Sequence, residues 1–451
     1  MKYDLIIIGS GPAGYVAAIR AGQVGLKTAI IEKEKIGGMC LNWGCMPSKA
    51  LLESAKLFRR IENDAAKFGI EGIDKKAISF NYSKAIKRAS GIVMRLTKGV
   101  EFLLKKNNVE IITGQAVITS QTTISVENRT LEADNIIIAT GSKQPEIETD
   151  NKELVIDVKT LFTEREIPQN IVVAGEDATA LELAQLYNMI GKKVTLVAAT
   201  DRVLSLADDY LVNFALGIFK KEKIDIIYNF DINSTKGIYE NGELNINGQK
   251  IKCEMLINAR TRKAIVPENS ISLKMEDGFI ATDNNCRTEY KNIFAVGDVN
   301  GKSRFAHIGS AQGLHVIDIL KGINKELDIK KFPINMYTFP EMAQIGLRED
   351  EIKAKGIDYK ISEFPLSANG KAMTEGTSEG FLRILSETKY GEVLGVQIAA
   401  PNATDMIAEA SAYMQLESTV YDIAKTVHAH PTISEIFMEA GFEGVDGAIH
   451  K

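Results

Sequence analysis

The sequence predicts an α/β fold with two Rossmann-like nucleotide-binding domains, followed by a C-terminal α+β domain. Residues 3–24 read as a short buried strand, a glycine-rich loop and an apolar-periodic helix. A second strand–turn–helix begins at Asn170, in NIVVAGEDATALELAQLYNMIGKKVTLVAA, and repeats the first pattern. From about Phe332 a separate α+β region runs to the end. The internal repeat is what predicts two nucleotide-type domains.

The first glycine-rich loop has the pattern of a dinucleotide-binding fingerprint. A strand over residues 3–8 runs into GSGPAG, and a helix is expected over residues 15–24. Gly9 permits the tight turn, Gly11 lets the backbone approach a pyrophosphate, and Gly14 lets the helix pack on the strand. A second strand over residues 28–31 ends in Glu32, placed to accept a ribose hydroxyl. An ordinary glycine-rich turn in a βαβ unit is the alternative.

Two cysteines five residues apart, Cys40 and Cys45, follow this fingerprint in GGMCLNWGCMPSK. On a regular helix they would lie about 140° apart around the axis, whereas a disulfide needs Cα atoms within roughly 7 Å. The pair can therefore bridge only where the chain is irregular, and Gly44 and Pro47 fit such an irregular helix start. A thiol at a helix N-terminus gains thiolate character. Two buried structural thiols, or half of a zinc site, are the alternatives.

These residues carry a resemblance to a known family. GGMCLNWGCMPSKALL is similar to the redox-active segment of the dihydrolipoamide dehydrogenase branch of the FAD-dependent pyridine nucleotide-disulfide oxidoreductases. The likeness covers essentially the whole chain, through IIIATGS, IFAVGDV followed by FAH, YTFPEMAQIG and HAHPTISE. The first and last motifs are highly specific.

The resemblance implies roles for named residues. It makes Cys40 the interchange thiol, Cys45 the thiol facing the flavin, and His430 the base that Glu435 orients for the partner subunit's disulfide. Lys49 and Glu182 would form a pair at the flavin's reactive nitrogen, although Glu182 could be a helix-surface acid. His428 is expected to be a satisfied surface histidine. The residues implied for FAD binding are Gly9, Gly11, Gly14, Glu32, Lys49, Gly114, Thr140, Gly141, Asp298 and Ala306.

The second glycine loop departs from the family pattern. It reads Gly175-Glu176-Asp177-Ala178-Thr179-Ala180, so Asp177 stands where the backbone should approach a pyrophosphate. At an effective dielectric near 20, like charges ~4 Å apart repel by roughly 4 kcal/mol.

Two further positions in this second unit differ from the family. The following strand ends in Ala198 and Ala199 instead of an acid for the ribose, and Arg202 lies too far along to anchor NADP. Arg260 replaces the glycine of a G-R-R-P run, although Arg260 and Arg262 could offset some negative charge. NAD(P)H binding is therefore doubtful, with weak binding in a shifted geometry as the alternative.

Composition limits the class of partner and the location. The 451 residues have 45% hydrophobic and 25% charged content, a net charge of −5, and no evident basic cluster, so nucleic acid is not expected as a partner. No signal peptide, membrane span or metal site is expected, and the cysteine usage favours a cytoplasmic location.

Four segments and three functions are predicted. The segments are 1–145 (FAD domain with the redox pair), 146–270 (degenerate NAD-type domain), 271–330 (return to the FAD domain) and 331–451 (dimerisation domain). The favoured function is oxidation of a dithiol such as dihydrolipoamide, on a lipoyl group of another protein, by a homodimer whose electron partner is ferredoxin or flavodoxin instead of NAD(P)H. The alternatives are an ordinary NAD-dependent dihydrolipoamide dehydrogenase, and either another disulfide reductase or a non-catalytic flavoprotein subunit.

Overall fold

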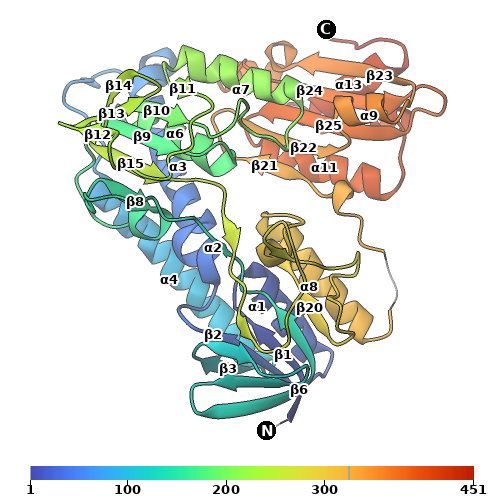
Figure 1. The fold of residues 1–451 in the computed structure, drawn as a ribbon. Helices are drawn as coiled ribbons and strands as arrows, with labels where there is room; N and C mark the ends of the chain where they lie inside the picture. Colours follow the sequence, from blue (N-terminus) through green and yellow to red (C-terminus); the bar gives the residue numbers. More distant parts are fainter. Residues whose placement is uncertain (1, 324–325) are drawn as a thin grey trace. The chain divides into compact units, whose positions relative to one another are not determined.

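The computed structural model describes residues 2–323 and 326–451, which form two compact units. The first contains the chain up to Asn170 together with Asn233–Leu327, and the second contains Ile171–Ile232 and Asp328–Lys451 (Figure 1). The predicted segments 1–145, 146–270, 271–330 and 331–451 are finer than this division and stay a prediction. Of the described helices, none has the length and apolarity needed to cross a membrane.

The first unit is built on a sheet whose central strands are parallel. The strand order is β17-β4-β5-β6-β1-β2-β3, with β20 also paired to β6. Leu5 and Ile7 face one side of this sheet, with α1 and α8, while Ile6 and Ile8 face the other, with the β4–β5 hairpin. All four side chains are buried, which is why β1 reads as a continuous apolar run. The strands are β1 (Lys2–Ile8), β2 (Thr28–Glu32), β3 (Glu110–Thr113), β4 (Ala116–Ile118), β5 (Thr123–Val126), β6 (Arg129–Ile138), β17 (Glu268–Asn269) and β20 (Ile293–Ala295).

The carboxyl ends of the parallel strands line up at one edge of this sheet. Ile8 is in register with Ile31 of β2 and with Ile138 of β6. Just beyond that register the Gly9 amide donates to the Ile31 carbonyl (2.8 Å), and the Ala139 amide donates to the Ile8 carbonyl (2.8 Å). Loops that follow different strands therefore meet at one edge, where ligands of doubly wound sheets bind.

Helices α1 and α8 cover one side of this sheet, and further helices complete the unit. The helices are α1 (Pro12–Gln23), α2 (Gly38–Trp43), α3 (Cys45–Asp64), α4 (Tyr82–Lys106), α5 (Val158–Leu161) and α8 (Ala306–Leu320), with short 3-10 helices η1 (Ala65–Phe68) and η2 (Gly297–Asn300). The expected start of the first helix at residue 15 is wrong. Helix α1 begins at Pro12, because proline at the first helical position needs no amide partner and has a helical φ.

Smaller strands complete the first unit. Strand β15 pairs in parallel with β8, β16 pairs with β7, β18 pairs with β19, and β12, β13 and β14 form a meander. Their bounds are β7 (Ser142–Lys143), β8 (Val155–Asp157), β12 (Tyr239–Glu240), β13 (Glu243–Ile246), β14 (Gln249–Lys252), β15 (Met255–Asn258), β16 (Lys263–Ala264), β18 (Met275–Glu276) and β19 (Phe279–Ile280).

The second unit contains the predicted repeat of the strand–loop–helix pattern. Strand β9 (Asn170–Ala174) leads into α6 (Ala178–Met189) and then β10 (Lys193–Val197), followed by α7 (Asp209–Lys221) and β11 (Asp225–Ile227). The Gly175 amide donates to the Val197 carbonyl (2.9 Å), as Gly9 does to Ile31 in the first copy. The two copies therefore share their local geometry.

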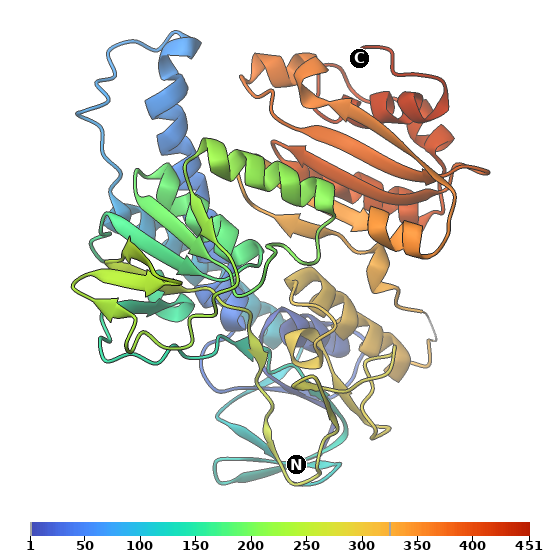
Figure 2. The same cartoon turned by 45° about the horizontal axis from the view of Figure 1, so that its top comes forward.

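The rest of the second unit is an antiparallel sheet covered by helices (Figure 2). Its strand order is β21-β22-β25-β24-β23, and its apolar side chains pack against α11 and α13. The elements are η3 (Ile329–Lys331), β21 (Ile334–Met336), β22 (Glu341–Gly346), α9 (Glu349–Ala354), β23 (Tyr359–Pro365), η4 (Leu366–Ala368), α10 (Gly370–Thr374), β24 (Phe381–Glu387), β25 (Val393–Ala400), α11 (Ala403–Gln415), α12 (Val420–Lys425) and α13 (Glu435–Val445). This confirms the predicted α+β region.

Candidate functional site: a nucleotide pocket beside two thiols

Each glycine of the first loop has a separate steric reason. Gly9 has φ +101°, and a Cβ there would lie 2.4 Å from the Ala139 carbonyl oxygen. A Cβ on Gly14 would lie 1.9 Å from the Gly9 carbonyl oxygen. A Cβ on Gly11 would meet nothing within 4 Å, although Gly11 lines a cavity. Gly9 and Gly14 are therefore required by the fold, whereas Gly11 leaves room for a ligand.

The N-terminus of α1 opens toward that cavity. Gly11 is the residue before the helix, and no side chain caps the amides of the first turn. Pro12 and Ala13 of this turn also line the cavity. Uncapped amides at a helix N-terminus are donors for phosphate oxygens, so this end of the pocket suits a pyrophosphate.

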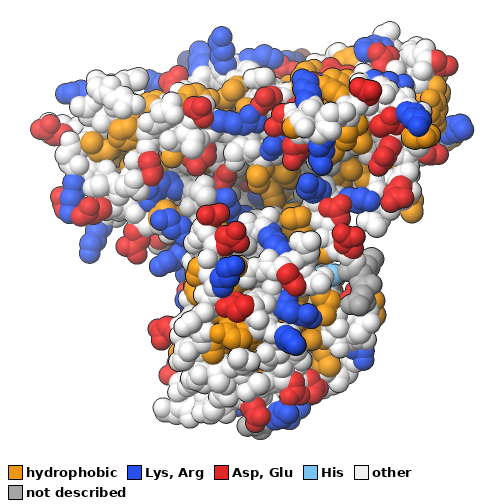
Figure 3. All heavy atoms as spheres, turned by 45° about the vertical axis from the view of Figure 1, so that its right-hand side comes forward, with side chains coloured by type: hydrophobic (Ala, Val, Ile, Leu, Met, Phe, Trp, Pro, Cys, Tyr) orange, Lys and Arg blue, Asp and Glu red, His pale blue; other side chains and the backbone are white. Residues whose placement is uncertain are grey.

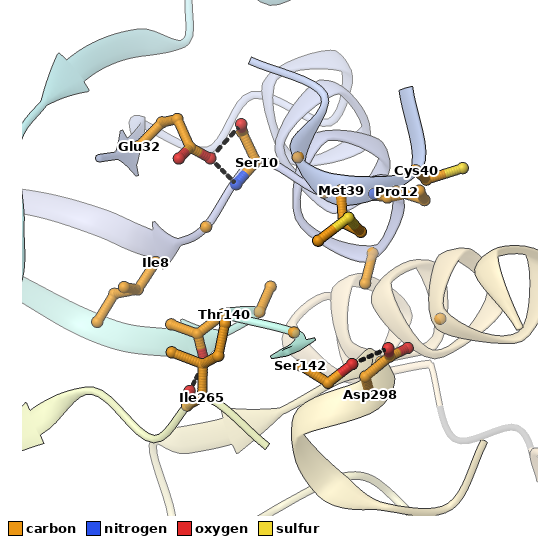
Figure 4. Close-up of a pocket in the computed structure, with 18 of the residues that line it drawn as sticks. Ile8, Ser10, Pro12, Glu32, Met39, Cys40, Thr140, Ser142, Ile265 and Asp298 are labelled. Atoms are coloured by element: carbon orange, nitrogen blue, oxygen red, sulfur yellow. Dashed lines mark hydrogen bonds between the residues drawn. The ribbon is translucent and has the colours of Figure 1, made fainter. Parts of the chain in front are cut away.

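Glu32 forms one wall of the pocket at the end of β2. One carboxylate oxygen accepts hydrogen bonds from the Ser10 amide (3.0 Å) and the Ser10 hydroxyl (2.5 Å), as Figure 4 shows. The other oxygen accepts from the Glu34 amide (2.8 Å). These bonds fix the carboxylate at the rim, where it can accept a ribose hydroxyl as predicted.

The opposite wall is formed around Asp298, near the start of η2. Its carboxylate accepts from the Ser142 hydroxyl (2.5 Å) and pairs with the Arg262 guanidinium (3.0 Å). Nearby, the Thr140 hydroxyl donates to the Ile265 carbonyl (2.5 Å). In Figure 4 the Asp298 and Glu32 groups lie on opposite sides of the pocket.

The cavity between these walls has a volume of about 330 Å³ and lies within the first unit. An uncapped helix N-terminus, a rim carboxylate and space at Gly11 together fit a dinucleotide such as FAD. Lys49 and Gly14 are not among the described residues that line it. The lining includes the predicted residues Gly9, Gly11, Glu32, Gly114, Thr140, Gly141, Asp298 and Ala306, and both thiols, Cys40 and Cys45.

The two cysteines meet because the helix breaks between them. Cys40 lies in α2, Cys45 is the first residue of α3, and Gly44 separates them with φ −123° and ψ −106°. A Cβ on Gly44 would lie 3.2 Å from the Met39 carbonyl oxygen, so a larger residue would crowd the break. The predicted irregular helix start is confirmed. Both cysteines are partly exposed thiols at the edge of the pocket.

The two thiols are close enough to interact. The pKa of Cys40 is raised above its usual range, chiefly because its thiol hydrogen-bonds with Cys45 and also because it is partly buried. The positive charge of Lys49 acts in the opposite direction. This direction favours the protonated thiol at Cys40, beside the sulfur of Cys45.

His430 and Glu435 form a hydrogen-bonded pair in the second unit. The His430 Nδ1 atom lies 2.9 Å from one Glu435 oxygen, and the Thr432 amide donates to the other (2.8 Å). Burial acts to raise the pKa of Glu435, but the hydrogen bonds from Thr432 and His430 together with the histidine charges lower it overall. The imidazole itself is 80% exposed, and its Nδ1 is the nitrogen that Glu435 engages.

The expectation that His428 lies at the surface is wrong. Its side chain is 7% exposed, its Nε2 lies 2.7 Å from Glu409, and its Nδ1 lies 3.0 Å from the Thr426 carbonyl. The ring also stacks on Phe437. The hydrogen bond to Glu409 raises the pKa of His428 against the effect of burial. His428 therefore packs beneath the segment that carries His430.

The second glycine loop is held by its own carboxylate. Asp177 directly precedes α6, at the position that Gly11 occupies before α1. A Glu176 oxygen accepts from the Ala199 amide (3.1 Å), just beyond the end of β10. In the first loop the acid comes from the strand end, at Glu32, and the donor from the loop, at Ser10. The two roles are exchanged in the second loop.

Glu182 is not the helix-surface acid considered as an alternative. It is 4% exposed, and one of its oxygens accepts from the Tyr337 amide (2.9 Å). One turn along α6, Gln185 exchanges hydrogen bonds with the backbone of Phe339. Within this unit both side chains therefore fix α6 to the segment that follows β21.

The idea that Arg260 and Arg262 offset charge at the second loop is not supported by their contacts. Arg260 is buried and donates to the carbonyls of Pro145 and Glu146 (both 3.0 Å) and to the Asn233 side chain (2.6 Å). Arg262 pairs with Asp298 at the first pocket. Both side chains are engaged within the first unit.

Several residues at the pocket were missed from the sequence. Ser10 and Ser142 bind the two wall carboxylates, but serine in a loop carries no signal of its own. Trp43 lies between the cysteines, and the Lys159 ammonium lies 4.9 Å from its ring centroid while pairing with Glu34 (2.6 Å). The position of Trp43 inside the cysteine motif was the only available signal for this group.

Comparisons with known proteins agree with this geometry. Residues 3–313 match the model of the pyridine nucleotide-disulphide oxidoreductases, and residues 332–441 match their dimerisation domain. Dihydrolipoyl dehydrogenase of Bacillus subtilis is 36% identical, covering 100% of this chain and 99% of the relative. The enzyme of the same name from Cupriavidus necator is 34% identical, covering 97% of each. LpdA from Mycobacterium tuberculosis, 23% identical, shares the fold with a TM-score of 0.87 over 97% of this chain and 98% of that one.

Proposed function

Because the chain belongs to the pyridine nucleotide-disulphide oxidoreductases and is an FAD-dependent disulfide oxidoreductase, we propose that it oxidises a dithiol of the dihydrolipoamide type. The relatives named dihydrolipoyl dehydrogenase support this substrate class. The single observation that carries the proposal is the pair of interacting thiols, Cys40 and Cys45, at the edge of the FAD pocket.

The chemistry follows from thiol–disulfide exchange. When Cys40 and Cys45 are bridged, a substrate thiolate attacks the sulfur of Cys40 and releases Cys45 as a thiolate. The second substrate thiolate then attacks the mixed disulfide, which releases oxidised substrate and leaves both cysteines reduced. Two electrons and two protons leave the substrate in this exchange. FAD, when bound, supplies the two-electron acceptor beside the cysteines.

His430 is the base in this proposal. Only thiolates attack disulfides, so a group must take the substrate proton near neutral pH. The exposed imidazole, held at Nδ1 by Glu435, has its other nitrogen available for that proton. The match to a dimerisation domain supports a homodimer, and we propose that His430 serves the cysteines of the partner subunit.

We further propose that the electrons leave to a one-electron carrier such as ferredoxin or flavodoxin instead of NAD(P)H. Asp177 adds a side chain and a charge where a pyrophosphate would approach the start of α6. Glu176 engages the amide after β10, and Ala198 offers no carboxylate to a ribose. Two carrier molecules would each take one electron per dithiol.

Anaerobic titration of the purified flavoprotein tests both parts of the proposal. Dihydrolipoamide should bleach the flavin absorbance promptly, whereas NADH and NADPH should do so far more slowly, and reduced ferredoxin should reduce the flavin directly. Slow or absent bleaching by dihydrolipoamide would refute the substrate class. Rapid bleaching by dilute NADH would refute the altered electron partner and leave an ordinary NAD-dependent dihydrolipoamide dehydrogenase.

Variants of the second loop separate crowding from charge. Asp177→Gly combined with Ala198→Glu should raise NADH-driven flavin reduction, because it restores both the backbone approach and the ribose anchor. Asp177→Asn with Ala198→Glu is the matched control, since it removes the charge but keeps the side chain. Arg260 stays unchanged, because its buried hydrogen bonds are structural. If the glycine variant gains nothing over wild type, Asp177 does not block the site.

A further inference from the structure

The exposed face of α4 is strongly basic, which the sequence analysis did not anticipate. The helix contains seven lysine or arginine residues and one acid, Glu101, so it carries a net charge of +6. The whole chain carries −5, which leaves −11 for everything outside α4. The expectation of no basic cluster is wrong because these residues are spaced along a helix instead of standing in one run.

The basic residues of α4 share one side of the helix. At 100° per residue they fall within a stripe about 100° wide, and the first and last are separated by ~33 Å along the axis. Together they define the basic stripe: Lys84, Lys87, Arg88, Arg95, Lys98, Lys105 and Lys106.

Few of these charges are neutralised within the described residues. Lys87 lies 3.6 Å from Glu164, and Arg88 donates to the Ala50 carbonyl (2.9 Å). The remaining five form no ion pair with any residue that the structure describes. On the face drawn in Figure 3, by contrast, acidic and basic side chains are interspersed.

Apolar side chains lie in and beside the basic stripe. Phe102 is 63% exposed and falls at its centre, one turn from Lys98 and Lys106, and Met94 at its edge is 56% exposed. Aromatic residues, methionine and arginine are the residue types enriched in protein interfaces. An exposed aromatic ring among cations therefore indicates a protein partner.

The surroundings argue against other occupants. A nucleic acid needs a basic surface that continues beyond one helix, whereas the rest of the chain has a net charge of −11. A membrane-surface helix turns its apolar face to lipid, whereas the apolar side of α4, including Ile86, Val100 and Leu104, is buried in its own unit. A symmetric contact between two copies of the basic stripe would bring like charges together.

We propose that the basic stripe of α4 is a docking surface for a small acidic redox protein, which approaches as the electron carrier. Only the identity of this partner rests on the function proposed above. Helix α4 packs against α1 and α2, and α2 carries Cys40. A protein bound to α4 is therefore held on the unit that contains the FAD pocket.

Charge reversal tests the basic stripe directly. The stripe variant is Lys84→Glu, Arg95→Glu and Lys98→Glu, which changes three exposed side chains away from the pocket. The matched control is Lys250→Glu, Lys252→Glu and Lys274→Glu, three exposed lysines of the same unit with the same change in net charge. Binding of an acidic flavodoxin and an acidic ferredoxin to each flavoprotein is measured at low and high salt.

The stripe variant should bind both carriers roughly tenfold or more weakly at low salt, while the control stays near wild type. At ~1 M salt the difference should vanish, since the Debye length is then about 3 Å. Bleaching of the flavin by free dihydrolipoamide should be equal in all three proteins. No carrier binding to wild type, or equal loss in the control, overturns the proposal.

Three further outcomes are decisive. The stripe could bind phosphatidylglycerol vesicles or duplex DNA more tightly than it binds the carriers. That result would identify a membrane or a nucleic acid as the occupant and overturn the proposal. Dissociation of the stripe variant into monomers would make the stripe a subunit contact and overturn it as well. Stripe-dependent binding without electron transfer would support the docking surface but refute the proposed electron partner.

Discussion

Two glycines of the first loop, Gly9 and Gly11, should respond to alanine in opposite ways. In Gly9→Ala the new Cβ would lie 2.4 Å from the Ala139 carbonyl oxygen at φ +101°. The backbone strain costs about 1–2 kcal/mol and the overlap about 1–3 kcal/mol. For a unit of this size, each kcal/mol lowers the unfolding temperature by roughly 2–4 °C. Gly9→Ala should therefore lower it by roughly 4–20 °C.

Gly11→Ala should spare the fold and weaken FAD binding. No protein atom lies within 4 Å of the new Cβ, which points into free space at the cavity. Losing glycine before α1 costs below about 1 kcal/mol, so the apoprotein should unfold within a few degrees of wild type, by about 1–3 °C. The methyl group occupies the space where a pyrophosphate would approach, so FAD affinity should fall by roughly tenfold or more.

The assay compares the apoproteins by circular dichroism during heating and then measures FAD binding by quenching of flavin fluorescence. Each variant adds one methyl group, at positions two residues apart, so each serves as the control for the other. Equal loss of stability in both variants would refute the separate steric roles. Unchanged FAD affinity in Gly11→Ala would refute the placement of the pyrophosphate at this loop.

The remaining predictions concern the histidines. His430→Ala should slow dithiol oxidation by roughly two to four orders of magnitude, whereas His428→Ala should mainly lower thermal stability; equal kinetic effects would show that His430 is not the base. Glu409 raises the pKa of His428 in the folded chain. The Glu409–His428 pair therefore stabilises the folded state fully below the unfolded pKa of about 6.5, and this contribution is lost as pH rises through the folded pKa. Thermal unfolding between pH 5.5 and 9, on either side of that value of about 6.5, should show this loss in wild type but not in Glu409→Gln. Heterodimers of Cys45→Ser and His430→Ala subunits should regain activity, and heterodimers that form but stay inactive would place base and cysteines in one subunit.

Local features of the site could be predicted from the sequence. The roles of Gly9 and Gly14 depend on atoms a few residues away or on the adjacent strand, so the fingerprint was sufficient. The helix break at Gly44 followed from the geometry of five-residue spacing. The position of Glu32 followed from the order of strand, loop, helix and strand.

Features that depend on long-range contacts could not be predicted. His428 is buried because Glu409, 19 residues earlier in the chain, and Phe437 of α13 pack against it. Arg260 was interpreted by its place in a motif, but its partners come from residues 145, 146 and 233. The basic stripe needs the phase of a regular 25-residue helix, and a search for consecutive charges misses it.

The hydrogen bond between Glu176 and the Ala199 amide affects which substitutions this loop can tolerate during evolution. A loop that depends on a dinucleotide for order is under selection to keep that ligand. This loop has an internal substitute, since its own carboxylate satisfies the amide at the strand end. If the ligand were lost, this hydrogen bond would still hold the end of the strand, and substitutions at Asp177 and Ala198 would be tolerated more easily. Under the proposed loss of nicotinamide binding, a return to nicotinamide use would need Asp177 and Ala198 to change together, so the loss would be hard to reverse.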